Sequence, residues 1–156
     1  MLACTTTALR LLGQRVLMLD AQLARLETAL AWRVASAAPR LLEVFGVGID
    51  SAATLLVTAG DNPARIKSGA AWAHLCEVAP IKASSGKVTR VRLDRGGDRH
   101  ANSALWVVVI TCIRNDERTK AYDERRLKEG KSKPEIIRVL ERYVAREVYR
   151  CLPRNS

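Results

Sequence analysis

The chain has 156 residues, of which 48% are apolar and 4% aromatic, and its formal net charge is +10. The apolar content excludes a disordered chain, and the scarcity of aromatic rings argues against an RNA-binding sheet built on stacking. The charge is uneven, because residues 1–80 hold seven basic and six acidic side chains, whereas residues 81–156 hold 19 and 10. The second half is therefore expected to bind an acidic partner, most simply nucleic acid.

Cysteines, histidines and hydropathy narrow the chemistry further. The cysteines and histidines form no metal-ligand spacing, so we expect this chain to bind no metal or other cofactor. They are Cys4, Cys76, Cys112, Cys151, His74 and His100. The longest apolar run, residues 104–112, is too short to cross a bilayer, so no membrane partner is expected. Residues 1–7 lack the features of a signal peptide, and we expect a bacterial cytoplasmic location.

Residues 9–30 are predicted to form a long helix. Apolar side chains recur at alternating steps of three and four: Leu9, Leu12, Val16, Leu19, Leu23, Leu26 and Leu30. This alternation is typical of a coiled-coil seam, and we expect residues 1–37 to be an arm that joins copies into a homo-oligomer. The same pattern also suits an amphipathic helix packed on its own domain.

Residues 39–60 have the pattern of a helix-hairpin-helix. Two glycines separate a short helix from a second one, which Asp50 could cap and Gly60 could end. Glycines let a backbone approach a phosphate closely, and helix N–H groups can point at it. The candidate contacts to a DNA or RNA backbone are therefore Gly46, Val47 and Gly48. A tight corner that needs its glycines only for positive φ is the alternative.

The next segment changes from helical to extended. Ser68 is a candidate cap for a helix over residues 69–77. Residues 83–86 are predicted to form a turn, and residues 87–93 alternate basic or polar side chains with apolar ones. This alternation predicts a short strand or ribbon with a cationic wet face. Residues 96–98 form a second predicted turn, which can cap the helix that follows.

Three helices are predicted to complete the chain, over residues 101–113, 119–128 and 134–152. The first is apolar on all sides and is the candidate core helix. The last has a predicted buried stripe of Ile136, Ile137, Leu140, Tyr143, Val144, Val148 and Leu152. It also carries a row of arginines, Arg138, Arg142, Arg146 and Arg150. This row either contacts phosphate or is a solvated face with Glu135, Glu141 and Glu147 interleaved.

Four segments of the sequence resemble those of a known family and follow one another in the same order as in that family. They are Phe45-Gly-Val-Gly-Ile-Asp-Ser-Ala-Ala-Thr-Leu-Leu, Ala79-Pro80 with Ser84-Ser85-Gly86-Lys87, Arg95-Gly-Gly-Asp-Arg-His-Ala-Asn-Ser-Ala-Leu and Glu135-Ile-Ile-Arg-Val-Leu-Glu-Arg-Tyr-Val-Ala-Arg-Glu-Val-Tyr. Together they are similar to the C-terminal transposase domain of the bacterial insertion-sequence family numbered one hundred and ten. That family includes the pilin-gene invertase and the bridge-RNA-guided recombinases, and its coiled-coil linker is similar to the heptad helix here.

The resemblance implies an activity and a site. Enzymes of that family attack a DNA phosphodiester with a serine, and the phosphoserine link keeps the bond energy for rejoining. The family's serine directly precedes a glycine, which corresponds to Ser85, with Ser84 as the neighbouring alternative. Positive charge at the phosphate would come from DNA-binding side chains nearby: Lys87, Arg90, Arg92, Arg95 and Arg99. The residues alone would predict only a turn here.

The match to the family is partial. The family usually has proline where Phe45 stands, and we expect this sequence to lack the N-terminal RuvC-like domain, whose acidic residues bind Mg²⁺. The Mg²⁺ is therefore expected in that missing domain, and the isolated chain is expected to be inactive without it. The expected partners are DNA, a guide (bridge) RNA and further copies of the chain.

Three functions and one fold follow. The chain is a transposase or recombinase fragment that supplies a serine, a non-catalytic nucleic-acid-binding dimerisation module, or a helical adaptor that uses its arm. The fold is expected to be mainly α, with a heptad (coiled-coil) arm over residues 1–37. A domain over residues 38–156 is expected to contain the helix-hairpin-helix and a short basic β-ribbon.

Overall fold

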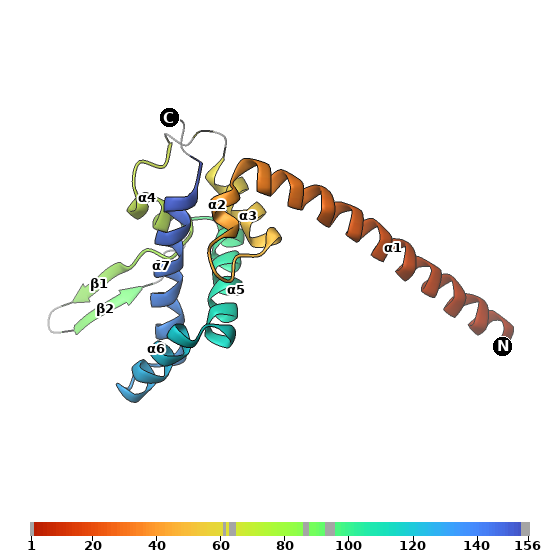
Figure 1. Ribbon diagram of the computed structural model, residues 1–156. Coiled ribbons are helices and arrows are strands. Elements are labelled where there is room, and N and C mark those ends of the chain that lie inside the picture. Colours follow the sequence, from red (N-terminus) through yellow and green to blue (C-terminus); the bar gives the residue numbers. More distant parts are fainter. Residues whose placement is uncertain (1, 61, 63–64, 86–87, 93–95, 154–156) are drawn as a thin grey trace.

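The computed structural model describes residues 2–60, 62, 65–85, 88–92 and 96–153, and for 82–85 and 88–92 it describes the backbone. The described part of the chain forms seven helices and a two-stranded ribbon (Figure 1). In chain order they are α1 (Leu2–Ala37), α2 (Pro39–Leu42), α3 (Ile49–Ala59), α4 (Gly69–Leu75), β1 (Ile81–Ser85), β2 (Val88–Arg92), α5 (Arg99–Asn115), α6 (Glu117–Lys128) and α7 (Lys133–Cys151). The prediction of a mainly α fold is confirmed.

Helix α1 stands away from the other helices over most of its length (Figure 1). Its 36 residues span about 54 Å at 1.5 Å per residue. The heptad side chains from Leu9 to Leu26 are exposed, and packing against the body begins at Leu30 and Val34. The predicted long helix is therefore present, and the described part of its own chain leaves most of its seam uncovered.

Helix α5 lies at the centre of the body and packs against α3, α6 and α7. Its side chains Leu105, Val108 and Val109 are fully buried. The prediction of a core helix is confirmed, but Trp106 and Val107 are about half exposed, so this helix is not buried on all sides although its sequence is apolar all round. The reason is geometric, because the neighbouring helices do not surround α5 and leave one face in water.

Helix α7 buries most of its predicted stripe, with two corrections. Tyr143 is 49% exposed, whereas Glu141, predicted on the solvated face, is 5% exposed. Because α7 packs against α2, α4 and α5, its buried arc runs through residues 141, 145 and 148, which share one side of a helix. Burial raises the pKa of Glu141 to about 7.

The ends of the shorter helices test the predicted caps. Gly48, not Asp50, precedes α3, because the Ala52 N–H already bonds to the Gly48 carbonyl at 2.9 Å. Asp50 thus lies in the first turn, where a carboxylate still suits the helix dipole. Gly60 ends α3 with a φ of +71°, as predicted. Ser68 caps α4 and accepts from the Ala71 N–H.

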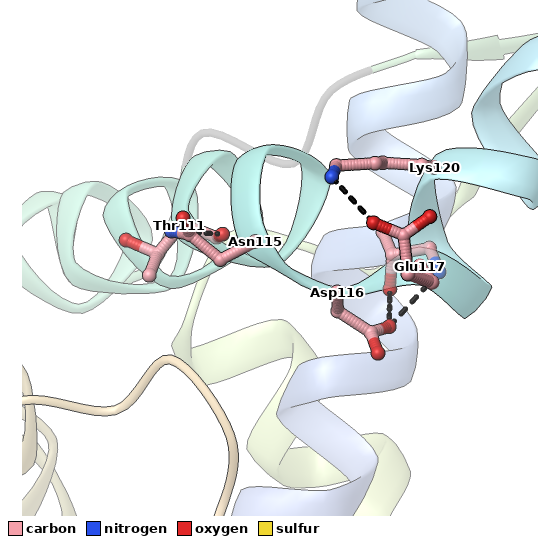
Figure 2. A network of polar contacts seen from close by, with 6 residues as sticks. Thr111, Asn115, Asp116, Glu117 and Lys120 are labelled. Carbon is pink, nitrogen blue, oxygen red and sulfur yellow. Dashed lines mark hydrogen bonds and ion pairs between the residues drawn. The ribbon is translucent and has the colours of Figure 1, made fainter.

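A sharp corner joins α5 to α6 (Figure 2). The Asp116 carboxylate accepts from the Thr119 N–H at 2.9 Å and from its hydroxyl at 2.5 Å, and these bonds lower the pKa of Asp116. Lys120 pairs with Glu117 one turn into α6. Asp116 therefore starts α6 two residues earlier than predicted, and the corner lets α7 return along α5.

Candidate nucleic-acid interface

The ribbon carries both candidate nucleophiles. Strands β1 and β2 are antiparallel, with Ser85 opposite Val88 and Ser84 opposite Thr89. The prediction of a turn over residues 83–86 is therefore wrong for residues 83–85, because strand pairing continues through Ser85; Gly86 lies outside the described residues. Ser85 is the last residue of β1.

The side chains predicted to bind DNA lie partly on the ribbon and partly at its foot, by which we mean residues 96–98, which lead from the ribbon into α5. Arg90 and Arg92 belong to β2, and their backbones pair with those of Ala83 and Ile81. Arg99 is the first residue of α5 and is exposed. Lys87 and Arg95, also predicted to bind DNA, lie outside the described residues. The fold thus brings Ser84, Ser85, Arg90 and Arg92 together on one two-stranded unit.

The ribbon extends from the body on the side opposite to α1 (Figure 1). Among the described residues, the close contacts of its strands are almost all with each other. A two-stranded ribbon alone is only marginally stable, so its foot has to set its direction.

Close packing fixes the foot of the ribbon against the end of α4. A Cβ atom at Gly97 would lie 2.4 Å from the Leu75 carbonyl oxygen, so only glycine fits there. The next residue, Asp98, donates its N–H to the same oxygen at 2.7 Å. On the other side, α4 ends two residues earlier than predicted, because the Val78 N–H turns back to the Ala73 carbonyl.

Asp98 contacts three helices at this foot: α4 through its N–H, and α5 and α3 through its carboxylate. Its carboxylate caps α5 by accepting from the His100 N–H at 2.8 Å, which confirms the predicted capping turn. The Thr58 hydroxyl, from α3, donates to the other carboxylate oxygen at 2.8 Å and is the main cause that lowers the pKa of Asp98. Asn102 donates to the Cys76 carbonyl at 3.3 Å.

The contributions of Thr58 and Asn102 were not foreseen from the sequence. Asp98 and Asn102 do fall within the third family-like segment, one helical turn apart, and that spacing was the available signal. Thr58 gave none, because its partner lies 40 residues further along the chain.

The glycine hairpin faces the core more than it faces solvent. Gly46 has a φ of +83°, and a Cβ there would lie 3.0 Å from the Cys112 Sγ and 3.1 Å from the Val108 carbonyl oxygen. Val47 is buried. Of the three predicted backbone contacts, only Gly48 is exposed with open space around it.

The charge around the hairpin is balanced rather than basic. Its exposed charged side chains are Arg40, Glu43 and Asp50. A phosphate there would meet two carboxylates for one guanidinium, so the electrostatic attraction is weaker than at the ribbon or α7.

The arginine row of α7 is accessible. Arg138, Arg146 and Arg150 are exposed and Arg142 is half-buried. Of the predicted interleaved glutamates, Glu141 lies in the core and is removed from this face. The row is therefore more cationic than the sequence pattern indicated.

Two further features complete the surface. An open groove of about 400 Å³ lies beside the foot of the ribbon, lined by Arg65, Ile66, Ala71, His74, Leu75 and Gly96. No three His, Cys, Asp or Glu side chains gather as a metal site within the described part of the chain. The four cysteines are free thiols, and burial raises the pKa of Cys76 and Cys112.

None of the helices that the structure describes is both long and apolar enough to cross a membrane.

Comparisons with known proteins place this helical body and its cationic ribbon among transposases. A model of the IS116/IS110/IS902 transposase family matches residues 38–124, from the start of α2 into α6. This is more than half of the chain, and the chain belongs to that family. The insertion element IS110 uncharacterized 43.6 kDa protein of Streptomyces coelicolor is 31% identical over 100 residues. The match covers 64% of this chain and 24% of that relative.

Proposed function

We propose that the chain is part of an insertion-sequence transposase and supplies Ser85 as the nucleophile of DNA strand exchange. The observation that supports this most is the placement of Ser85 at the end of β1, on a ribbon within the family-matched residues. The ribbon extends from the body, so a duplex could reach the end of β1 without displacing a helix (Figure 1).

The reaction is an exchange of phosphate esters. The Ser85 Oγ attacks the phosphorus of a DNA strand, the bond from phosphorus to the leaving strand oxygen breaks, and a phosphoserine link forms. The serine gives up its proton and the leaving oxygen takes one, so the step needs no oxidant or energy source. Arg90, on the strand paired with β1, supplies positive charge near the phosphate, and Arg92, opposite Ile81, and Arg99, at the start of α5, contact the strand further along its backbone.

We propose that the Mg²⁺ that the family resemblance implies is held by a RuvC-like domain and not by this part of the chain. The described residues contain no cluster of carboxylates, histidines and cysteines that fits a metal ion. We therefore assign no step of this chain to a metal and expect the ion in a RuvC-like domain.

We assign the remaining parts of the molecule to oligomerisation and to nucleic-acid binding. The arm over residues 1–37 pairs its exposed seam with another copy as a coiled coil. The domain over residues 38–156 holds DNA and a guide RNA through the ribbon and the α7 arginines. The helix-hairpin-helix contributes one backbone contact at Gly48, which is the part of the hairpin that is open.

Covalent trapping tests the proposed nucleophile. The chain is mixed with a RuvC-like partner domain and a suicide duplex carrying the element's ends, and protein–DNA adducts are resolved on a denaturing gel. We expect an adduct from the wild-type protein and from Ser84→Ala, and none from Ser85→Ala. An adduct that persists in Ser85→Ala at the wild-type level would contradict the proposal.

A second candidate function is a non-catalytic nucleic-acid-binding dimerisation module. The exposed arginine row and the exposed seam favour it, because binding and pairing through them need no serine. This function predicts salt-sensitive DNA binding that Ser85→Ala leaves unchanged, together with no covalent adduct from the wild-type protein.

A further inference from the structure

Two of the chain's three tyrosines meet where α6 packs against α7. The rings of Tyr122 and Tyr143 are 6.4 Å apart between centroids and cross at 88°, in an edge-to-face contact. Three guanidinium groups surround them. Arg125 and Arg126 lie 5.4 Å and 5.9 Å from the centroid of Tyr122, and Arg146 lies 5.9 Å from that of Tyr143. We call these five residues the tyrosine–arginine cluster.

The cluster is open to solvent. Tyr143 is 49% exposed, Arg125 and Arg146 are exposed, and Tyr122 and Arg126 are half-buried. A single exposed aromatic ring is ordinary on a protein surface. Here the exposed ring meets a second ring edge to face and lies within cation–π range of a guanidinium. This leaves a ring face and a cation side by side, where another planar group could pack.

The charge of the cluster is only partly neutralised. Glu129 pairs with Arg126 at 2.5 Å and approaches Arg125 at 3.9 Å. Arg146 makes no ion pair with the residues that the structure describes, so the three arginines and Glu129 leave the cluster with a net positive charge. Its occupant should therefore be both planar and anionic.

We propose that the tyrosine–arginine cluster binds unpaired bases of a single-stranded nucleic acid. Unpaired bases stack on aromatic rings and guanidinium planes while arginines hold the phosphates. A duplex offers phosphates and base edges but keeps its base faces stacked, so it gains little from the Tyr143 ring. This proposal rests on nucleic-acid binding by the proposed transposase and specifies which surface holds which strand.

Fluorescence anisotropy of the full-length chain tests this surface. The probes are a labelled 12-nucleotide RNA of mixed sequence, the DNA strand of that sequence and its duplex, all at one salt concentration. Tyr143→Ala is expected to weaken single-strand binding about tenfold or more and to leave duplex binding within about twofold. Tyr143→Phe keeps the ring and should bind single strands like the wild type.

Two controls separate stacking from charge and folding. Trp32→Ala removes another exposed ring, on α1 and outside the cluster, and should change no affinity. Arg146→Gln leaves the ring and should weaken single-strand binding as well. Thermal melts by circular dichroism check that each variant folds like the wild-type protein.

Each outcome separates the cluster from the proposed function. Single-strand affinity that survives both Tyr143→Ala and Arg146→Gln overturns the cluster as a binding site. Equal losses for single strands and duplex with Tyr143→Ala also overturn it, because stacking would not explain them. If neither duplex nor single strands bind the wild-type protein, the proposed function itself fails. RNA and DNA strands that differ in affinity identify which source of unpaired bases the cluster favours.

Discussion

Helices α1 and α7 are both long and amphipathic, yet they differ in what covers their apolar side. In α7, Ile136 and Val148 are 1% and 0% exposed. In α1, Leu12 and Leu19 are 63% and 41% exposed. The two stripes follow similar steps of three and four residues, so the periodicity alone does not distinguish them.

The difference teaches that periodicity identifies an apolar side but not its partner. The stripe of α7 lies against α4 and α5 of the same chain. The stripe of α1 meets the body only at its end, around Leu30 and Val34, and another molecule has to cover the rest if it is to be buried. The following predictions test this contrast, from the largest expected effect to the smallest.

Truncating the α7 stripe should have the largest effect. We expect Ile136→Ala to lower the free energy of unfolding by about 2–5 kcal/mol, because it leaves a cavity under a fully packed helix. Leu12→Ala in α1 is the matched control and should change it by less than about 0.5 kcal/mol at low protein concentration. Urea denaturation measures both. Similar losses in the two variants would show that the helices are buried alike.

The carboxyl of Glu141 should make the burial of α7 depend on pH. Its pKa is raised from 4.5 to about 7 in the folded protein. Folding therefore favours the protonated form, and stability should fall as pH rises from about 4.5 to about 7. Glu141→Gln should raise the free energy of unfolding at pH 8 by about 3 kcal/mol and change it little at pH 4.

Glu147→Gln, on the exposed side of α7, is the control for this titration. Its stability should follow the wild-type curve between pH 4 and pH 8. If Glu141→Gln also followed the wild-type curve, Glu141 would not be buried on the core side of α7.

Removing the Thr58 hydroxyl should weaken the foot of the ribbon. We expect Thr58→Val to cost about 1 kcal/mol of stability and to speed amide hydrogen exchange in β1 and β2. The pKa of Asp98 is lowered in the fold, so its contribution is present above its usual pKa and is lost as pH falls through the folded value. Thr58→Val should reduce this loss of stability at low pH, whereas Thr58→Ser should keep the wild-type pH dependence. Unchanged amide exchange in Thr58→Val would show that the hydrogen bond from Thr58 to Asp98 does not hold the ribbon in place.

Charging the α1 seam should have the smallest effect on folding and a clear effect on assembly. The double variant Leu19→Asp with Leu23→Asp should keep the free energy of unfolding of the body within about 0.5 kcal/mol. Sedimentation equilibrium should show that the wild-type protein associates and that this variant is monomeric. Association of the variant at the wild-type strength would mean that the seam is not the contact.

The sequence predicts local structure well where a short segment carries the signal by itself. A long apolar segment located α5, helical periodicity located α7, Ser68 and Asp98 were recognised as caps, and alternation located β2. The prediction failed where burial depends on tertiary packing. Tyr143 was predicted to be buried and is exposed, and Glu141 was predicted to be solvated and is buried, because this depends on which helices flank α7.

The candidate site was predictable only in part for the same reason. Ser85 and Arg90 were found as residues, but their pairing on a ribbon depends on register. Thr58 gave no signal, because its contact with Asp98 exists only once α3 and α5 have packed together.

The measurement that tests the central claim most directly is the chemical identity of the linked residue. Adducts trapped on a suicide duplex can be digested with nuclease and protease, and the peptide spanning β1 and β2 analysed by tandem mass spectrometry. The proposed function predicts a nucleotide joined through phosphate to Ser85. A nucleotide on any other residue, or none on a protein that is supplied with its RuvC-like partner, would contradict it.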